Sequence, residues 1–437
     1  MRSVRLLLSM LPLPMIAACG GDEEPGPPPL LVPEGTISIS DANRFLPAEP
    51  IRSVETAVDV FTTDLGVSAG TTITIQLFDE LLFDTTNVAR DAALARRLDD
   101  FWFPADTSGP TGVGETIIDS GKPVTLVVDL QRRDRQWLVD WEGGVRDEPG
   151  NRETSFTFQA RESTQGRDYQ DHLLEEISGA LSAVDATGAP VTRLVIGTEL
   201  ERHYLAAPQD WPYVAAFIGE LEAALAVSHP SVQLSVGINW SNFMDAVVPA
   251  FYVEGMDADT VDYLAVSNAW KQVIDPLYYA PDAVQDILEG GRTNAAPRLD
   301  FLAFSSIPDP ARYNGDPAGI RENHYAGIAT VFDRESFRNS TSVVWFQVGW
   351  PSGTDNAETA GRFLQRFLAL NSFPGADNQP AVAAISWWGF NHTLEGECTQ
   401  LTSPRIGANR TVCFRGLYPT IPQISAQNSL LRTFFGR

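Results

Sequence analysis

One carboxylate, two amides and several indoles stand where short apolar runs of the sequence end. Glu199 follows one such run, and Asn239 with Trp240 closes another. Gln347 ends a third run, and Trp387 lies in a fourth. Indole faces stack on the apolar faces of sugar rings, while carboxylates and amides form hydrogen bonds with sugar hydroxyls. These residue types point to carbohydrate recognition, provided that the fold brings the four ends together.

Eight short apolar runs, most of them rich in β-branched residues, are predicted to be strands. They cover Thr36–Ser40, Thr72–Phe78, Val124–Asp129, Thr192–Thr198, Val232–Ile238, Asp300–Phe304, Val343–Gln347 and Val382–Trp388. Strands that are apolar on both faces are typical of a parallel sheet covered by helices. The amphipathic stretches between them are predicted helices, namely Ser53–Asp64, Asn87–Phe101, Tyr169–Val184, Trp211–Val227, Tyr325–Phe337 and Glu358–Leu370.

This alternation predicts the α/β class and a single-domain (β/α)₈ TIM barrel over residues 35–437. One segment makes the strand count ambiguous, because Val261–Val266 resembles Leu299–Phe304. We take the second as strand six and the first as a helix or an insertion. A doubly wound open sheet is the other architecture considered, although no Gly-rich phosphate loop follows a strand. With neither that loop nor a cluster of metal-ligand residues, we expect no cofactor and no metal.

The N-terminus has the features of an export signal. Residues 1–18 combine a basic start, an apolar stretch and small residues before Cys19. This pattern resembles the lipobox of bacterial lipoproteins, which implies cleavage before Cys19, acylation of its sulfur and a place in the cell envelope. Residues 19–34 are rich in Pro and Gly and are predicted to be a tether, so a lipid would be the only membrane contact. The alternative is an ordinary signal peptide. Gly20 favours the outer membrane if the source is Gram-negative.

Charge and the two remaining cysteines narrow the partners further. The chain has 31 basic and 56 acidic residues in 437, a formal net charge of −25, which disfavours nucleic acid as a partner. Cys398 and Cys413 are fifteen residues apart in a chain that is expected to be exported, so we predict a disulfide between them. Two free thiols are the alternative. Nothing in the sequence indicates the oligomeric state.

Two motifs carry a family resemblance. Residues 197–199 read Gly-Thr-Glu at the end of strand four, and residues 347–352 read Gln-Val-Gly-Trp-Pro-Ser at the end of strand seven. Their order and spacing resemble the retaining glycoside hydrolases built on (β/α)₈ barrels, especially galactanase-like members. There the motifs read Gly-Asn-Glu and Glu-x-Gly-x-Pro-Ser. The resemblance implies that Glu199 takes the acid/base position and Gln347 the nucleophile position.

The sequence departs from that family at two positions. Thr198 replaces the Asn that would hold a sugar hydroxyl, and Gln347 replaces the nucleophilic Glu. Retaining hydrolysis needs two carboxyl groups about 5–5.5 Å apart, and a neutral amide is a poor nucleophile. The resemblance therefore implies a cell-surface lipoprotein that binds a poly- or oligosaccharide, with hydrolysis impaired or lost. The residues expected to contact the sugar are Thr198, Asn239, Trp240, Trp350 and Trp387.

Two other functions stay open. The protein is an active glycoside hydrolase if Glu199 serves as acid/base and a nonstandard nucleophile replaces Gln347. That nucleophile would be another carboxylate, such as Asp129, or a group of the substrate itself. The second alternative is a structural or assembly lipoprotein that inherited the barrel without its chemistry. In that case Glu199 would only pair with Arg193 or Arg202.

Overall fold

The computed structural model describes fourteen stretches of the chain. They are residues 34–40, 71–79, 124–132, 169–185, 191–206, 208–244, 263–288, 297–306, 342–348, 367, 370–371, 381–388, 399–402 and 409–412. The chain divides into two units, Met1–Leu30 and Leu31–Arg437, and every described residue belongs to the second.

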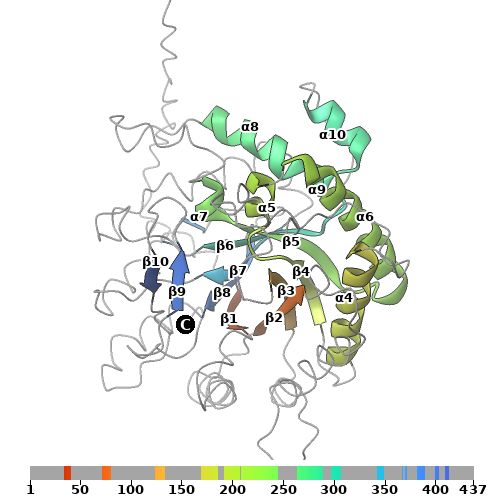
Figure 1. The fold of residues 1–437 in the computed structure, drawn as a ribbon, viewed down its shortest axis with the longest axis vertical. Helices are drawn as coiled ribbons and strands as arrows, with labels where there is room; N and C mark the ends of the chain where they lie inside the picture. The colour runs from red at the N-terminus through yellow and green to blue at the C-terminus, as the bar shows by residue number, and fades with distance from the viewer. Residues whose placement is uncertain are drawn as a thin grey trace, which may run out of the picture. The chain divides into compact units, whose positions relative to one another are not determined.

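Eight parallel strands pair side by side in chain order. They are β1 (Glu34–Ser40), β2 (Thr71–Asp79), β3 (Val124–Arg132), β4 (Val191–Ile196), β5 (Gln233–Asn239), β6 (Phe301–Ser306), β7 (Ser342–Val348) and β8 (Val382–Trp388). β8 also pairs with β1, so the sheet closes into a barrel (Figure 1). The predicted parallel α/β barrel is confirmed, and each predicted strand lies within three residues of its observed bounds.

The described helices lie between β3 and β6. They are α4 (Tyr169–Asp185), α5 (Leu200–Ala206), the 3₁₀ turn η4 (Pro208–Asp210), α6 (Trp211–Ser228), α7 (Trp240–Asn242), α8 (Tyr263–Val273), α9 (Asp275–Tyr278) and α10 (Pro281–Leu288). Helices α4 and α6 confirm two predictions. The helical interpretation of Val261–Val266 is also confirmed, because α8 begins inside that segment.

Four of the predicted helices lie wholly or mostly outside the described residues, and a short hairpin follows β8 in the chain. Ser53–Asp64, Asn87–Phe101 and Tyr325–Phe337 lie outside the described residues, and only two residues of Glu358–Leu370 are described. Two short antiparallel strands, β9 (Thr399–Thr402) and β10 (Asn409–Val412), follow the barrel in the chain and are not among the predicted strands. Within the described part of the chain, no helix is both long and apolar enough to cross a membrane.

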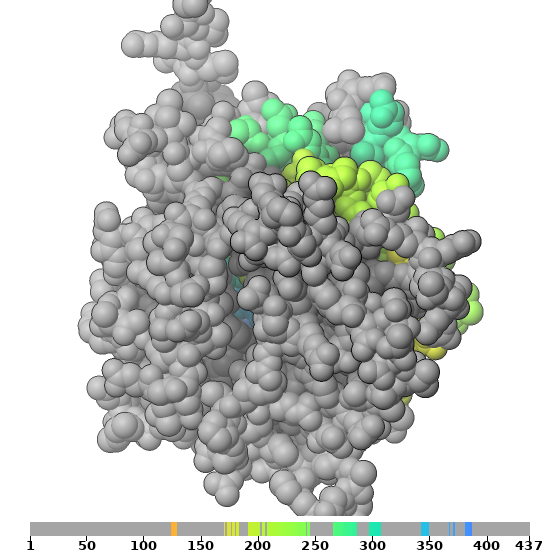
Figure 2. Space-filling model, viewed as in Figure 1, coloured from red at the N-terminus to blue at the C-terminus, as the bar shows by residue number. Residues whose placement is uncertain are grey.

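Helix α6 shows how sequence spacing places a helix on the barrel. Its buried residues recur every three or four positions, as one helix face requires, and they are Trp211, Val214, Phe217, Ile218, Leu221 and Leu225. Tyr213, on another face, is 39% exposed. In the space-filling view, the coloured surface comes mainly from the helical segments between β4 and β6, while the strands are largely hidden (Figure 2).

A cluster of apolar side chains fills the inside of the barrel. Its members come from five strands and are Val127, Val195, Phe301, Ala303, Val344, Phe346 and Ala384. Strands β3 and β7 are not neighbours in the sheet, so their side chains can only share a cluster inside the barrel. Because successive side chains of a strand point to opposite faces, Ser305 and Ser386, each two residues beyond a cluster member, also face this interior.

A second, aromatic cluster lies on the outer face of β6. Trp240, at the start of α7, packs on Phe243, Trp270 and Phe304, with ring centroids 5.4, 6.4 and 5.3 Å away. The Trp240 side chain is fully buried. The indole fills the space between β6 and the helices that cover it, and the contact of Trp240 with carbohydrate stays a prediction.

Candidate functional site

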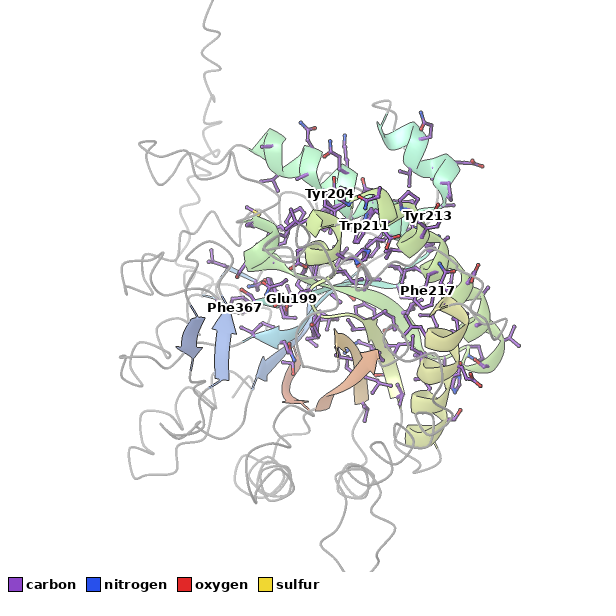
Figure 3. All side chains as sticks on the ribbon, viewed as in Figure 1. Glu199, Tyr204, Trp211, Tyr213, Phe217 and Phe367 are labelled. Atoms are coloured by element: carbon purple, nitrogen blue, oxygen red, sulfur yellow. The ribbon has the colours of Figure 1, made fainter. Side chains whose placement is uncertain are left out.

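A glycine turn after β4 positions Glu199. Gly197 has a φ of 72°, a conformation that L side chains rarely adopt, and its N–H donates to the Val128 carbonyl of β3 at 2.7 Å. A Cβ at this position would lie 2.8 Å from the Leu200 Cγ. Glycine therefore lets the chain turn sharply from β4 into α5, and the partly exposed Glu199 lies between the two (Figure 3).

A second glycine lets β5 approach that turn. A Cβ on Gly237 would lie 2.1 Å from the Gly197 carbonyl oxygen and 3.0 Å from the Phe346 ring, so no other residue fits without movement of the backbone. Gly237 pairs with Ala303, one of the interior residues. The two glycines thus bring the carboxyl ends of β4 and β5 together.

The predicted acid and one predicted amide meet at these ends. The Asn239 side-chain amide donates to Glu199 Oε1 at 2.8 Å, and Asn239 is 4% exposed. The carboxyl ends of β4 and β5 therefore lie next to each other. Burial of the amide against the carboxylate fixes the orientation of both side chains, since an unsatisfied amide would be costly to bury.

A polar row continues from Asn239 across two more strands. Asn239 pairs with Ser305 of β6, and Ser305 pairs with Gln347 of β7. The Ser305 hydroxyl donates to the Thr198 carbonyl at 3.2 Å, which ties β6 to the turn after β4. We call Glu199, Asn239, Ser305 and Gln347 the polar row. It joins one carboxylate, two amides and a hydroxyl along the carboxyl ends of β4 to β7.

A bulge in β7 sets the place of Gln347. On β6, Phe304 pairs with Trp345 and the next residue, Ser305, pairs with Gln347, so Phe346 is the extra residue in β7. A bulge of this kind re-aims the side chains after it and is frequent beside active sites. Without it, Phe346 would stand opposite Ser305. The bulge therefore puts an amide, which is 8% exposed, at the level of the polar row.

Ser386 of β8 adds an unsatisfied hydroxyl. It is 1% exposed, and its oxygen has no hydrogen-bond partner among the residues that the structure describes. Neither Ser305 nor Ser386 is among the site residues predicted from the sequence. The available signal was their place two residues beyond an interior alanine, and that signal has meaning only once the strand register is known.

Helix α5 is held in place beside the row. The buried Glu201 accepts the Asn239 backbone N–H at 2.9 Å. Two residues further on, His203 Nε2 lies 2.7 Å from Asp210 Oδ2, and both residues are buried. Tyr204 packs edge-on against Trp211 at 5.5 Å, and Figure 3 shows these two side chains together above Glu199. These contacts fix the helix that follows Glu199 at both of its ends.

The remaining predicted site residues divide into two groups. Thr198 is 4% exposed, and its carbonyl has the structural contact with Ser305; its role in sugar binding stays a prediction. The other group, whose side chains lie outside the described residues, comprises Trp350, Trp387, Asp129, Cys19, Cys398 and Cys413. Within the described residues, no group of three or more His, Cys, Asp or Glu residues is placed to hold a metal ion.

Comparisons with known proteins find likeness in structure alone. No family model matches the sequence, and no curated protein gives a significant match. Similar solved structures include the GH53 catalytic domain of Ignisphaera aggregans, with 10% identity over 94% of this chain and 98% of that chain at a TM-score of 0.49. A β-glucosidase from Exiguobacterium marinum has 12% identity over 92% and 97%, at a TM-score of 0.48. The endo-1,4-β-D-mannanase of Thermotoga petrophila RKU-1 has 14% identity over 93% and 99%, at 0.44. Similarity at this level does not show which family the chain belongs to.

Proposed function

We propose that this protein is an exported bacterial lipoprotein whose barrel binds a poly- or oligosaccharide at the carboxyl ends of its strands. In this proposal residues 35–437 form one complete (β/α)₈ domain of glycoside-hydrolase type, held to the cell envelope by acylated Cys19. The observation that carries the binding function is the polar row, and above all the 2.8 Å bond between Asn239 and Glu199.

The chemistry of the row suits a sugar. A carboxylate accepts hydrogen bonds from hydroxyls, and an amide both donates and accepts, so the row matches the mixed donors and acceptors of neighbouring sugar hydroxyls. Glu199 is the partly exposed member, while Asn239, Ser305 and Gln347 are buried behind it. Ligand contact therefore begins at Glu199, and the Asn239 amide sets its orientation.

The same row argues against retaining hydrolysis with two enzyme carboxylates. Glu199 is its one carboxylate, and Gln347 is an amide that can neither attack an anomeric carbon well nor stabilise an oxocarbenium ion by charge. Glu201 is close in sequence, but it is fully buried and bonded to the Asn239 backbone, so it cannot reach a sugar. We therefore propose that the barrel binds carbohydrate, in preference to the proposal that it hydrolyses it.

The test is a glycan array probed with the full chain, followed by calorimetry on the sugars that bind. Glu199→Gln keeps the shape of the side chain but removes its charge, and we expect about a tenfold loss of affinity. The matched control is Glu220→Gln on the exposed face of α6, which should leave binding unchanged. Failure to bind any glycan would contradict the proposal and favour a structural lipoprotein.

Two activity measurements separate binding from hydrolysis. If the native protein turns over a glycan and Glu199→Gln abolishes this, the function is hydrolysis with a nucleophile other than Gln347. If instead Gln347→Glu creates glycosidase activity in an inactive protein, the second carboxylate was the missing part. The second result would support the binding proposal, and the first would replace it.

A further inference from the structure

A fully buried carboxylate lies directly behind the polar row. Glu201 is the second residue of α5, and its side chain has no exposed surface. Its Oε2 accepts the backbone N–H of Asn239 at 2.9 Å. Burial of a carboxylate is costly unless donors surround it, so this bond is part of what makes the position tolerable for Glu201.

Asn239 is consequently held from two sides by one short segment. Its backbone N–H donates to Glu201, while its side-chain amide donates to Glu199 Oε1 at 2.8 Å. The two carboxylates are two residues apart and flank the beginning of α5, and Asn239 is the last residue of β5. We call Glu199, Glu201 and Asn239 the clamp.

We infer that Glu201 is a positioning residue, which fixes the Asn239 main chain so that the Asn239 amide orients Glu199. The amide can reach Oε1 only if the Asn239 Cα stays where β5 ends, and Glu201 anchors the nitrogen bonded to that Cα. The clamp follows from the contacts themselves, whereas its effect on a sugar rests on the proposed function.

Other contacts at this junction limit what the loss of Glu201 would change. The Ser241 hydroxyl, two residues after Asn239, lies 2.7 Å from the Ser306 hydroxyl of β6. Asn239 also keeps its register with Ser305. The end of β5 thus remains tied to β6 without Glu201, and we expect variants at Glu201 to fold with a local change at Asn239.

The clamp is tested first without any ligand, by NMR of the full chain with ¹⁵N-labelled asparagine. Glu201→Met removes the acceptor at similar volume, and Glu201→Gln keeps one acceptor oxygen. We expect Glu201→Met to move the backbone and the side-chain amide signals of Asn239 together, with the backbone proton upfield because its hydrogen bond is lost. Glu201→Gln should restore most of both shifts. Movement of the backbone signal alone would overturn the inference.

Affinity is tested second, with cellohexaose, β-1,4-mannohexaose and β-1,4-galactohexaose as probes in calorimetry. Glu201→Met should weaken a sugar that binds by about tenfold, as should Asn239→Leu, and the double variant should be no weaker than either, because both break the same chain of contacts. Additive losses would overturn the inference. Glu220→Met is the control for loss of an acidic side chain. If none of the three sugars binds and the array is also negative, the proposed function fails, while the NMR result still decides the clamp.

Discussion

At the scale of single residues, Asn239 belongs both to the clamp and to the polar row. Its side chain bonds Glu199, its backbone bonds Glu201, and its register partner Ser305 leads on to Gln347. Glu199, Asn239 and Gln347 can be recognised in the sequence from their places at predicted strand ends. The burial of Trp240 is not visible in the sequence, because the direction of a side chain in the first turn of a helix depends on how that helix packs against its neighbours.

The substitution Asn239→Asp should make the deficit in unfolding free energy relative to wild type depend on pH. Two carboxylates at hydrogen-bond distance repel each other when both are ionised. The new aspartate would thus have a raised pKa in the folded state, and stability would fall as pH rises through that pKa. We expect about 1–3 kcal/mol less unfolding free energy than wild type at pH 7, with a smaller deficit near pH 4.

Chemical denaturation at the two pH values checks this expectation. Asn239→Leu is the matched variant, because it removes the bond to Glu199 without adding charge. Its deficit should change less between the two pH values than the deficit of the aspartate variant. An aspartate variant whose deficit changes no more than that of Asn239→Leu would contradict the assigned contact.

At the scale of elements, β5 and β6 are held together near their first residues, and a side chain of α9 adds hydrogen bonds to both strands. Leu234 and Asp300 exchange two hydrogen bonds, of 2.7 and 2.9 Å. Tyr278, at the end of α9, adds its hydroxyl, which donates to the Phe301 carbonyl at 2.8 Å and lies 3.0 Å from the Ser235 hydroxyl. Burial raises the pKa of the Tyr278 phenol, although its hydrogen bond with Ser235 acts in the opposite direction.

Arg298 fixes α9 in the position from which Tyr278 reaches the strands. Its guanidinium donates to the Leu277 and Pro276 carbonyls at 3.0 and 2.8 Å, where helix carbonyls lack partners. Burial lowers the pKa of Arg298, and the nearby Glu222 of α6 partly opposes that shift. The strands, α6 and α9 therefore depend on one another at this edge.

The unfolding free energies of Tyr278→Phe and wild type should differ less at high pH than at neutral pH. A phenol with a raised folded-state pKa contributes stability that is complete below its unfolded value, about pH 10, and is lost as pH rises through the higher folded value. We expect the variant to be about 1–3 kcal/mol less stable at pH 7, because its hydroxyl contacts are lost. The difference should be smaller at pH 11.

Urea unfolding followed by circular dichroism at pH 7 and pH 11 measures both differences. Tyr213→Phe is the control, since Tyr213 is on α6 and is 39% exposed. It should match wild type at each pH. A Tyr278→Phe deficit that stays the same from pH 7 to pH 11 would rule out titration of the buried phenol as its cause.

At the scale of the whole molecule, two predictions concern residues that precede or follow the barrel strands in the sequence, namely the disulfide and the lipid anchor. The hairpin β9–β10 pairs Thr399 with Val412. Cys398 and Cys413 come directly before and after these strands in the sequence and lie outside the described residues. The disulfide between them stays a prediction, which rests on their spacing and on the expected export of the chain.

We expect Cys398 and Cys413 to resist iodoacetamide in the denatured, unreduced protein and to react after treatment with dithiothreitol. Peptide mass mapping locates the modified residues. Closure of a loop of about 15 residues stabilises by about 3 kcal/mol in the chain-entropy model, so reduction should lower the unfolding midpoint. Alkylation of both cysteines without reductant would disprove the bridge.

The lipid anchor has an equally direct test. Labelled palmitate should be incorporated into the protein in a bacterial host, and Cys19→Ala should abolish the label and move the protein from the membrane to the soluble fraction. Cys398→Ala is the matched cysteine control and should keep the label. Unchanged labelling of Cys19→Ala would exclude this residue as the acylation site.

The sequence by itself determined the barrel strands, two of the helices and the strand-end position of Glu199, Asn239 and Gln347. It did so because apolar periodicity and chain order are local properties that parallel β/α units follow closely. Only the tertiary structure decided that Trp240 lies in the hydrophobic core and that a bulge in β7 pairs Gln347 with Ser305. It also decided that Glu201 accepts a hydrogen bond from the Asn239 backbone. These facts depend on strand register and on helix packing, which are set by contacts between residues far apart in the sequence, such as Glu201 with Asn239 and Thr198 with Ser305, 38 and 107 positions apart.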